Sequence, residues 1–202
     1  FVETVFDYCE MSGCCIDGVD LRQARFNNTD LEGVDLTTTQ IKETHFTLCN
    51  MKKVNLSKVD LSGSDLSDSD LSMAKLSEAR LNHAICNQVN FTAADLSNCS
   101  MQDMICNTAD FAEANLEGVR LEKSDLQCSR FERAMLIRAN FSNARLDRAE
   151  FNHANCEDAI FRSAQMPYAD FSHAILTGAD FSKANLLQSK LHRAKDKRTN
   201  WK

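Results

Sequence analysis

The chain contains nine cysteines and five histidines, the residue types that most often bind metals or act as nucleophiles. No two cysteines are separated by two residues, so their spacing gives no support for a structural zinc site. Cys15 and Cys128 are expected to be exposed thiols. The other seven fall at two recurring positions, described below, where a small apolar side chain is expected: Cys9, Cys14, Cys49, Cys86, Cys99, Cys106 and Cys156.

Two of the histidines, His153 and His173, lie twenty residues apart, with Arg133 and Arg193 at the same spacing before and after them. A pair of neighbouring imidazoles could bind a metal ion or respond to pH. The flanking arginines disfavour a bound cation, so a solvated surface is the preferred interpretation of this pair.

Catalytic motifs are absent from the sequence. It has no glycine-rich phosphate loop and no Gly-x-Ser-x-Gly nucleophile turn. The repeat described below also runs without one inserted residue, which leaves no segment to build a pocket over a filled core. The sequence therefore predicts a protein that is not an enzyme and that uses no cofactor or metal.

The composition limits the class of protein further. The chain has 202 residues, with one proline, six glycines and a net charge of −6. So few prolines and glycines argue against long irregular loops, and no apolar run is long enough to span a membrane. An odd number of mostly inward cysteines suits a reducing compartment. We therefore expect a cytoplasmic protein, with delivery into a host or target cell as part of a secreted protein as the alternative.

Large apolar residues recur at every fifth position from Phe1 to Leu191. These 39 large sites hold 18 Leu, 12 Phe, 4 Met, 2 Ile and 3 Cys, and they include every phenylalanine of the chain. Two residues before each large site lies a small site, mostly Ala, Val, Ser, Thr or Cys, and between them lies a middle site that is often Asp or Asn. A period of five fits neither an α-helix nor a flat strand, so the chain must turn a corner every five residues.

Like side chains at the large sites recur at every twentieth residue, which predicts four corners in each coil. The fold is therefore expected to be all-β, a four-sided parallel β-helix of about ten coils stacked at the spacing of neighbouring strands. Cys86 and Cys106 would lie in adjacent coils, within reach of a disulfide, although buried free thiols are the preferred interpretation. The expected core columns are Leu36, Leu56, Leu76, Leu96, Leu116 and Leu136, and Phe91, Phe111, Phe131, Phe151 and Phe171.

Segments such as Ala-Asp-Leu-Ser-Asn at 94–98 and Ala-Asn-Leu-Glu-Gly at 114–118 carry the repeat in full. The pattern resembles that of the pentapeptide repeat family, and the resemblance implies a right-handed quadrilateral β-helix. We expect this β-helix over residues 1–195. A C-terminal cap or tail is expected at 196–202, because Asp196 places a charge at a large site. The start at Phe1 suggests the repeat domain of a larger bacterial protein.

One column of middle sites is mainly acidic. Residues 1–100 hold 15 acidic and 8 basic residues, a net charge of −7, whereas residues 101–202 hold 14 and 15, a net charge of +1. The column is a candidate protein-binding acidic wall. Alternatively, its Asp and Asn side chains accept hydrogen bonds from turn amides whatever the protein binds. The column contains Glu10, Asp30, Asn50, Asp70, Asn90, Asp110, Arg130, Glu150 and Asp170, and its carboxylates are the candidate site residues.

Two functions follow from these features and from the resemblance. The preferred one is a non-enzymatic scaffold for an unidentified protein partner, in an effector or a secretion-associated component. The alternative is a DNA mimic that binds DNA gyrase or topoisomerase and alters its activity or quinolone sensitivity, which the modest net charge disfavours. Direct binding of nucleic acid is not expected, because exposed stacking aromatics are absent. A dimer through an end coil is a further expectation, since exposed strand edges need covering.

Overall fold

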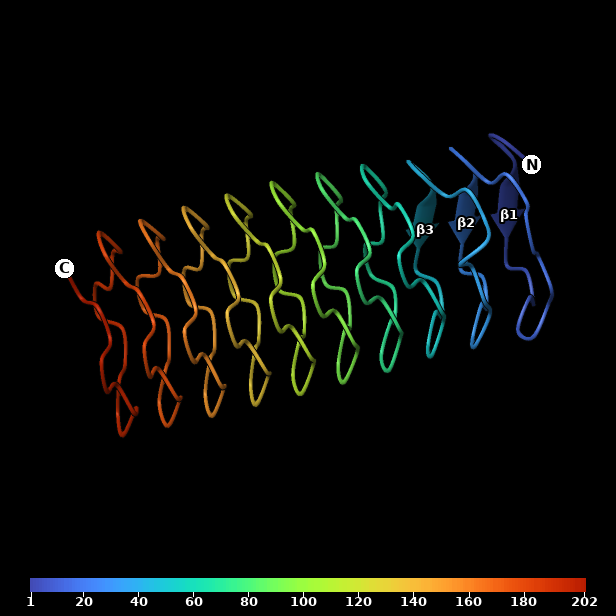
Figure 1. The fold of residues 1–202 in the computed structure, drawn as a ribbon. Coiled ribbons are helices and arrows are strands. Elements are labelled where there is room, and N and C mark those ends of the chain that lie inside the picture. The colour runs from blue at the N-terminus through green and yellow to red at the C-terminus, as the bar shows by residue number, and fades with distance from the viewer.

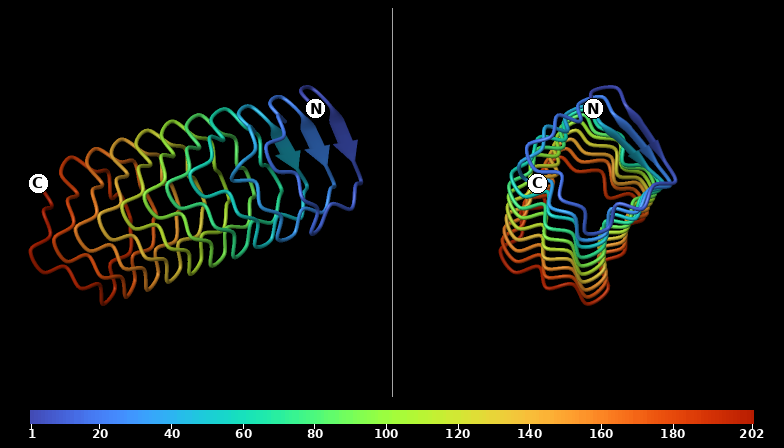
Figure 2. Two further views of the ribbon diagram at one scale, coloured as in Figure 1. Left: turned by 45° about the vertical axis from the view of Figure 1, so that its right-hand side comes forward. Right: turned by 90° about the vertical axis from the view of Figure 1, so that its right-hand side faces the viewer.

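The five-residue repeat winds the chain into a rod of stacked coils, shown in Figure 1 by a computed structural model that describes residues 1–202. The two termini lie at opposite ends of the rod, and the view toward its end in Figure 2 shows a four-sided outline. No part of the chain forms a helix long and apolar enough to cross a membrane.

Neighbouring coils pair in parallel with a register of twenty residues. The first three coils contain the strands β1 (Val5–Asp7), β2 (Arg25–Asn27) and β3 (His45–Thr47), which form a parallel sheet in the order β1-β2-β3. Elsewhere a single middle-site residue of each wall bridges its counterpart twenty residues later, as Asp35 does with Asn55. The structure thus confirms the all-β parallel fold and the twenty-residue coil.

Residues 30–34 show how a five-residue unit pairs all of its backbone amides. The amides of Leu31 and Gly33 donate to carbonyls of the next coil at 2.7 and 2.8 Å, and that of Asp30 donates to the previous coil at 2.9 Å. The amide of Val34 donates to the Leu31 carbonyl at 3.1 Å and closes the corner turn. The remaining amide, of Glu32, donates to the Asp30 side chain at 3.0 Å. Because all five donors are paired, the coil can repeat without buried unsatisfied backbone.

The second residue after each large site forms the corner and takes a positive φ. Every corner residue from Glu3 to Arg198 except Thr38 has this left-handed conformation, which a four-residue turn of type II requires at its third position. All six glycines lie at corners, where a residue without Cβ avoids the steric cost of positive φ.

Substituting Gly178 by alanine is expected to destabilise the rod more than the same substitution at Gly33. Both glycines have positive φ, at 74° and 69°, but a Cβ at Gly178 would lie 2.1 Å from Asp158 Oδ1, whereas nothing lies within 4 Å of a Cβ at Gly33. The control G33A should lose about 1 kcal/mol from backbone strain alone, and G178A should lose slightly more, because the exposed Asp158 side chain must turn away from the new Cβ. Thermal unfolding of both variants measures the difference in lost stability. Adding Asp158→Ala to G178A should reduce this difference. Equal losses at the two glycines would contradict a steric clash with Asp158.

The large sites fill the centre of the rod with stacked columns. Leu36, Leu56, Leu76, Leu96, Leu116 and Leu136 are fully buried, as are Phe91, Phe111, Phe131, Phe151 and Phe171. The phenylalanine rings of the latter column stack in adjacent coils with centroids 4.5–5.0 Å apart. Rings from the opposite wall, such as Phe141, meet them edge to face at 5.7 Å. Stacked and edge-on contacts are the favourable arrangements of aromatic rings, and they leave no space inside the coil.

The cysteines follow the repeat with one exception. All nine are free, and Cys86 and Cys106 are fully buried in adjacent coils without a disulfide. Cys15 and Cys128 are exposed. Cys14 is also exposed, contrary to the expectation of an inward thiol, because it belongs to the first coil and another coil packs against it from one side only.

Residues 196–202 continue the path of the coil. Asn200 bridges Asp180, and the Thr199 amide donates to the Asp196 carbonyl at 3.1 Å in a turn like those of the other coils. Asp196 is exposed to solvent in this last turn. The Trp201 ring stacks on Phe181 with centroids 4.8 Å apart, so this segment covers the end of a phenylalanine column.

Candidate interaction walls

The candidate site residues of the acidic wall lie in one continuous column along the rod. Each middle-site residue bridges the next, from Glu10 through Asp170 to Lys190. The fold therefore brings the six candidate carboxylates onto one surface, in every coil or every second coil.

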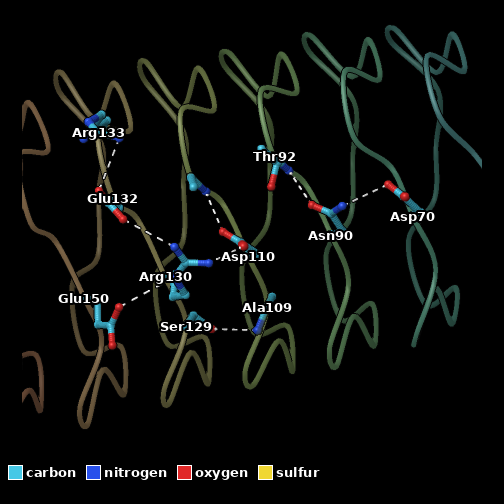
Figure 3. Close-up of polar contacts among 11 residues, drawn as sticks. Asp70, Asn90, Thr92, Ala109, Asp110, Ser129, Arg130, Glu132, Arg133 and Glu150 are labelled. Carbon is cyan, nitrogen blue, oxygen red and sulfur yellow. Dashed lines mark hydrogen bonds and ion pairs between the residues drawn. The ribbon is translucent and has the colours of Figure 1, made fainter.

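Most of these carboxylates are engaged by neighbouring side chains (Figure 3). Arg130 donates to Asp110 at 2.7 Å and lies 3.6 Å from Glu150 and 3.3 Å from Glu132. Arg130, which breaks the acidic run in the sequence, thus joins the carboxylates of three successive coils. Its charge offsets part of the negative charge in the middle of the wall.

Amide and ammonium groups engage the carboxylates of the remaining coils. Asn50 donates to Asp30 at 2.9 Å, and Asn90 donates to Asp70 at 3.1 Å. The ammonium groups of Lys52 and Lys190 lie 3.3 Å from Asp70 and Asp170, respectively. The acidic wall is therefore a ladder of paired side chains, with Glu10 exposed at its N-terminal end.

The same aspartates hold the corner turns. In each case one carboxylate oxygen accepts the amide two residues later at 2.9–3.0 Å, as Asp30 does from Glu32. Asp70, Asp110 and Asp170 accept in the same way from Ser72, Ala112 and Ser172. This geometry favours the alternative stated from the sequence, in which Asp and Asn occupy middle sites to satisfy turn amides.

These hydrogen bonds shift the acidity of the aspartates. Burial acts to raise the pKa of Asp70 and Asp170. Hydrogen bonds from the side chains and amides of Ser72 and Ser172, and from the nearby lysines, outweigh it and hold each pKa below its usual value. On another wall, the Arg22 side chain and amide lower the pKa of Asp20 to about 2. These groups therefore favour the folded state in their ionised form.

Acidification is expected to destabilise the rod. Because the pKa values of Asp20, Asp70 and Asp170 lie below the unfolded value of about 3.9, their stabilisation is complete above that pH and is lost as pH falls toward 2. The melting temperature of the native rod should fall between pH 5 and pH 2. The melting temperature of D70N should fall less over the same range, because position 70 then carries a neutral amide, as positions 50 and 90 do. A constant or rising melting temperature over this range would contradict the claim that the ionised aspartates stabilise the rod.

The wall that contains β1–β3, which we call the strand wall, departs from the Asp/Asn pattern. Its middle sites include Val5, Arg25, Ile85 and Ile105 in place of Asp or Asn. Ile85 and Ile105 are 37% and 45% exposed and bridge each other in adjacent coils. This wall was not predicted from the sequence, although the absence of Asp and Asn from these middle sites is a signal that could have identified it.

Surface hollows are confined to the first coils. The largest has a volume of about 630 Å³ and lies along β1–β3, lined by Glu3, Val5, Gln23, Arg25, Glu43, His45 and Gly63. All five hollows of the molecule are lined by residues between Val2 and Gly63. They are open depressions on the outside of a filled core.

Three of the five histidines, His153, His173 and His192, lie together near the C-terminal end. The rings of His153 and His173 stack with centroids 4.8 Å apart, and His192 meets His173 edge to face at 5.6 Å. Desolvation, the neighbouring histidines and Arg193 lower the pKa of His173. No three His, Cys, Asp or Glu residues are arranged to hold a metal ion. The spacing of twenty residues correctly predicted that His153 and His173 are neighbours. It did not predict the contact with His192, because the next position in that column is Arg193.

Comparison with known proteins agrees with this geometry. A solved structure of HetL, a pentapeptide repeat protein involved in heterocyst differentiation regulation from the cyanobacterium Nostoc sp. strain PCC 7120, is 25% identical with a TM-score of 0.58, over 98% of this chain and 86% of HetL. QnrB1, a plasmid-mediated fluoroquinolone resistance protein, is 23% identical with a TM-score of 0.46, over 93% and 89% of the two chains. No curated protein sequence matches at a significant level.

The family model described as "Pentapeptide repeats (8 copies)" matches this chain at residues 14–52, 39–72, 74–105, 105–143, 114–152, 139–178 and 168–195. These matches extend over nearly all the coils, and members of the family fold as right-handed quadrilateral β-helices. The twenty-residue register and the left-handed corners are therefore the structural expression of this repeat, and the chain belongs to the pentapeptide repeat family.

Proposed function

We propose that this chain is a non-enzymatic protein-binding scaffold that recognises its partner on an outer wall. The observation that carries the proposal is the filled core. The large and small sites form one buried cluster of 58 residues along the rod, and the hollows are open depressions of the first coils only. Contacts with other molecules must therefore be made by the walls, corners and ends.

The backbone supports this role by holding the walls rigid. Amides of every unit donate to the neighbouring coils, so side chains on one wall are fixed at the coil spacing of about 4.8 Å. Solenoids of this kind present long recognition surfaces without chemistry of their own. The similar protein HetL is involved in regulation of heterocyst differentiation, a role consistent with binding to another protein.

The alternative function, a DNA mimic bound by gyrase, is less well supported by the acidic wall. B-form DNA carries one negative charge per about 1.7 Å of axis. The acidic wall has at most one carboxylate per coil at its middle sites, and Arg130, Lys52 and Lys190 lie against several of them. The negative charge available to a partner is therefore sparse compared with a phosphate backbone.

A supercoiling assay separates the two functions. Purified rod at tens of micromolar is expected to leave gyrase activity unchanged at low and high salt, with and without ciprofloxacin. Inhibition or drug protection that fades as salt increases would instead support DNA mimicry, because screened charges bind less strongly.

Protein capture tests the scaffold directly. Immobilised rod is expected to retain a partner saturably from a bacterial extract, whereas rod unfolded by Leu96→Asp should not. Equal retention by the folded and unfolded chains, or the absence of any saturably bound protein, would contradict the proposal.

A further inference from the structure

Two partly exposed isoleucines lie next to each other in the middle of the strand wall. Ile85 and Ile105 occupy middle sites in adjacent coils, bridge each other, and expose 37% and 45% of their surfaces. The residues that bridge them on either side are Asp65 and Asp125. We call Ile85 and Ile105 the isoleucine patch.

Turn stability does not account for isoleucine at these positions. An Asp or Asn at a middle site accepts the amide two residues later, which isoleucine cannot do. At Ile105 this task passes to an asparagine outside the middle sites: the Asn107 amide, two residues after Ile105, donates to Asn87 Oδ1 at 3.1 Å. Asn107 Oδ1 in turn accepts the Gln127 amide, two residues after Asp125, at 3.0 Å. The corner thus retains hydrogen bonds while the middle sites present apolar side chains to solvent.

The charges around the patch are mainly negative. Asp65 lies on the strand wall itself, and Asp68 and Asp103 lie on the corners that flank it. None of the three is in an ion pair, whereas Asp125 pairs with Arg145 at 3.0 Å. His83 and Lys123 are the other titratable or basic groups on the nearby corner. An apolar centre with unpaired carboxylates around it is complementary to apolar side chains flanked by lysine or arginine.

The spacing of the patch fits an α-helix that lies along the rod. Ile85 and Ile105 are one coil apart, about 4.8 Å along the axis. Helical residues three and four apart rise by about 4.5 and 6.0 Å, so one apolar face of a helix can contact successive coils. We propose that the isoleucine patch binds a basic amphipathic helix of a partner protein. This inference rests on the proposed scaffold function and assigns it a wall and a partner chemistry.

The test uses a fluorescent fourteen-residue helical peptide with leucines on one face and lysines on the other. Two control peptides replace lysine by glutamate or scramble the order. The test variant is I85N/I105N, which introduces the residue type that middle sites favour. The matched control is M135N/I175N, which makes the same change at two middle sites of another wall. Circular dichroism and thermal melting establish that both variants remain folded.

The native rod and M135N/I175N are expected to bind the lysine–leucine peptide equally, and I85N/I105N to bind it about tenfold more weakly, since about 1.4 kcal/mol of apolar contact is lost. The control peptides should bind weakly to all three proteins. Equal binding by both variants, equal binding of a control peptide, or no binding to the native rod would overturn the proposal. If I85N/I105N still captured a protein from extract as the native rod does, this inference alone would fail and the scaffold function would stand.

Discussion

Leu96→Asp is expected to unfold the central coils. Leu96 is fully buried between Leu76 and Leu116 in the leucine column, and no buried cation is available to pair with an aspartate there. An unpaired carboxylate in such a site costs several kcal/mol or takes up a proton. Because each coil is stabilised mainly by its neighbours, unfolding of this coil should also destabilise the coils that pack on either side of it. Circular dichroism and thermal melting should show loss of β structure at neutral pH.

The matched control for this prediction is Leu96→Met, which preserves volume and polarity and should cost less than about 1.5 kcal/mol. If L96D retained the melting temperature of the native rod, the assignment of every fifth residue to the interior would be wrong. Partial recovery of L96D is also expected at mildly acidic pH, above the range in which the native rod loses stability, because burial raises the pKa of the carboxyl group and protonation removes its charge.

Phe151→Ala is expected to cost about 3–5 kcal/mol, the range for removal of a buried aromatic side chain. The Phe151 ring stacks on Phe131 at 4.8 Å and Phe171 at 4.5 Å, and it meets Phe141 and Phe161 edge to face at 5.9 and 5.7 Å. Alanine would remove all four contacts and leave a cavity that the rigid coils cannot close.

Hydrogen exchange measures this loss locally. Amides of the coil that contains Phe151 and of its two neighbours should exchange faster in F151A, while the first coils keep their protection. The control Phe1→Ala removes a ring that is 69% exposed and should change exchange little. Faster exchange over the whole chain, or none at residue 151, would contradict nearest-neighbour stacking of the phenylalanine column.

The sequence allows the fold to be predicted in unusual detail because the positions of the buried residues follow a regular spacing along the whole chain. The spacing of five at the large sites sets the corner, and the recurrence of like residues every twenty positions sets the number of walls. From these two spacings the stacking of Phe131 on Phe151 follows before any coordinates are known, and the structure confirms it.

The contacts on the outer surface are less predictable, because a charged side chain there has several possible partners in its own and neighbouring coils. In the sequence, Arg130 interrupts the acidic column. In the structure, its guanidinium forms ion pairs with Asp110 and Glu150 and so connects the carboxylates on either side. The exposure of Cys14 depends on having a neighbouring coil on one side only. The hydrogen bond from the Asn107 amide to Asn87 Oδ1, which replaces the turn bond that Ile105 cannot make, is seen only in the structure.

Site-specific photo-crosslinking tests most directly whether the rod acts as a scaffold through an outer wall. A photoreactive amino acid is placed singly at Ile105, Asp110, Asn115 and Arg120, which are consecutive middle sites on the four walls of one coil. After exposure of the rod to bacterial extract and light, we expect one protein to be crosslinked, preferentially from position 105 on the strand wall. Failure of all four positions to crosslink any protein, with the variants folded, would contradict the scaffold account.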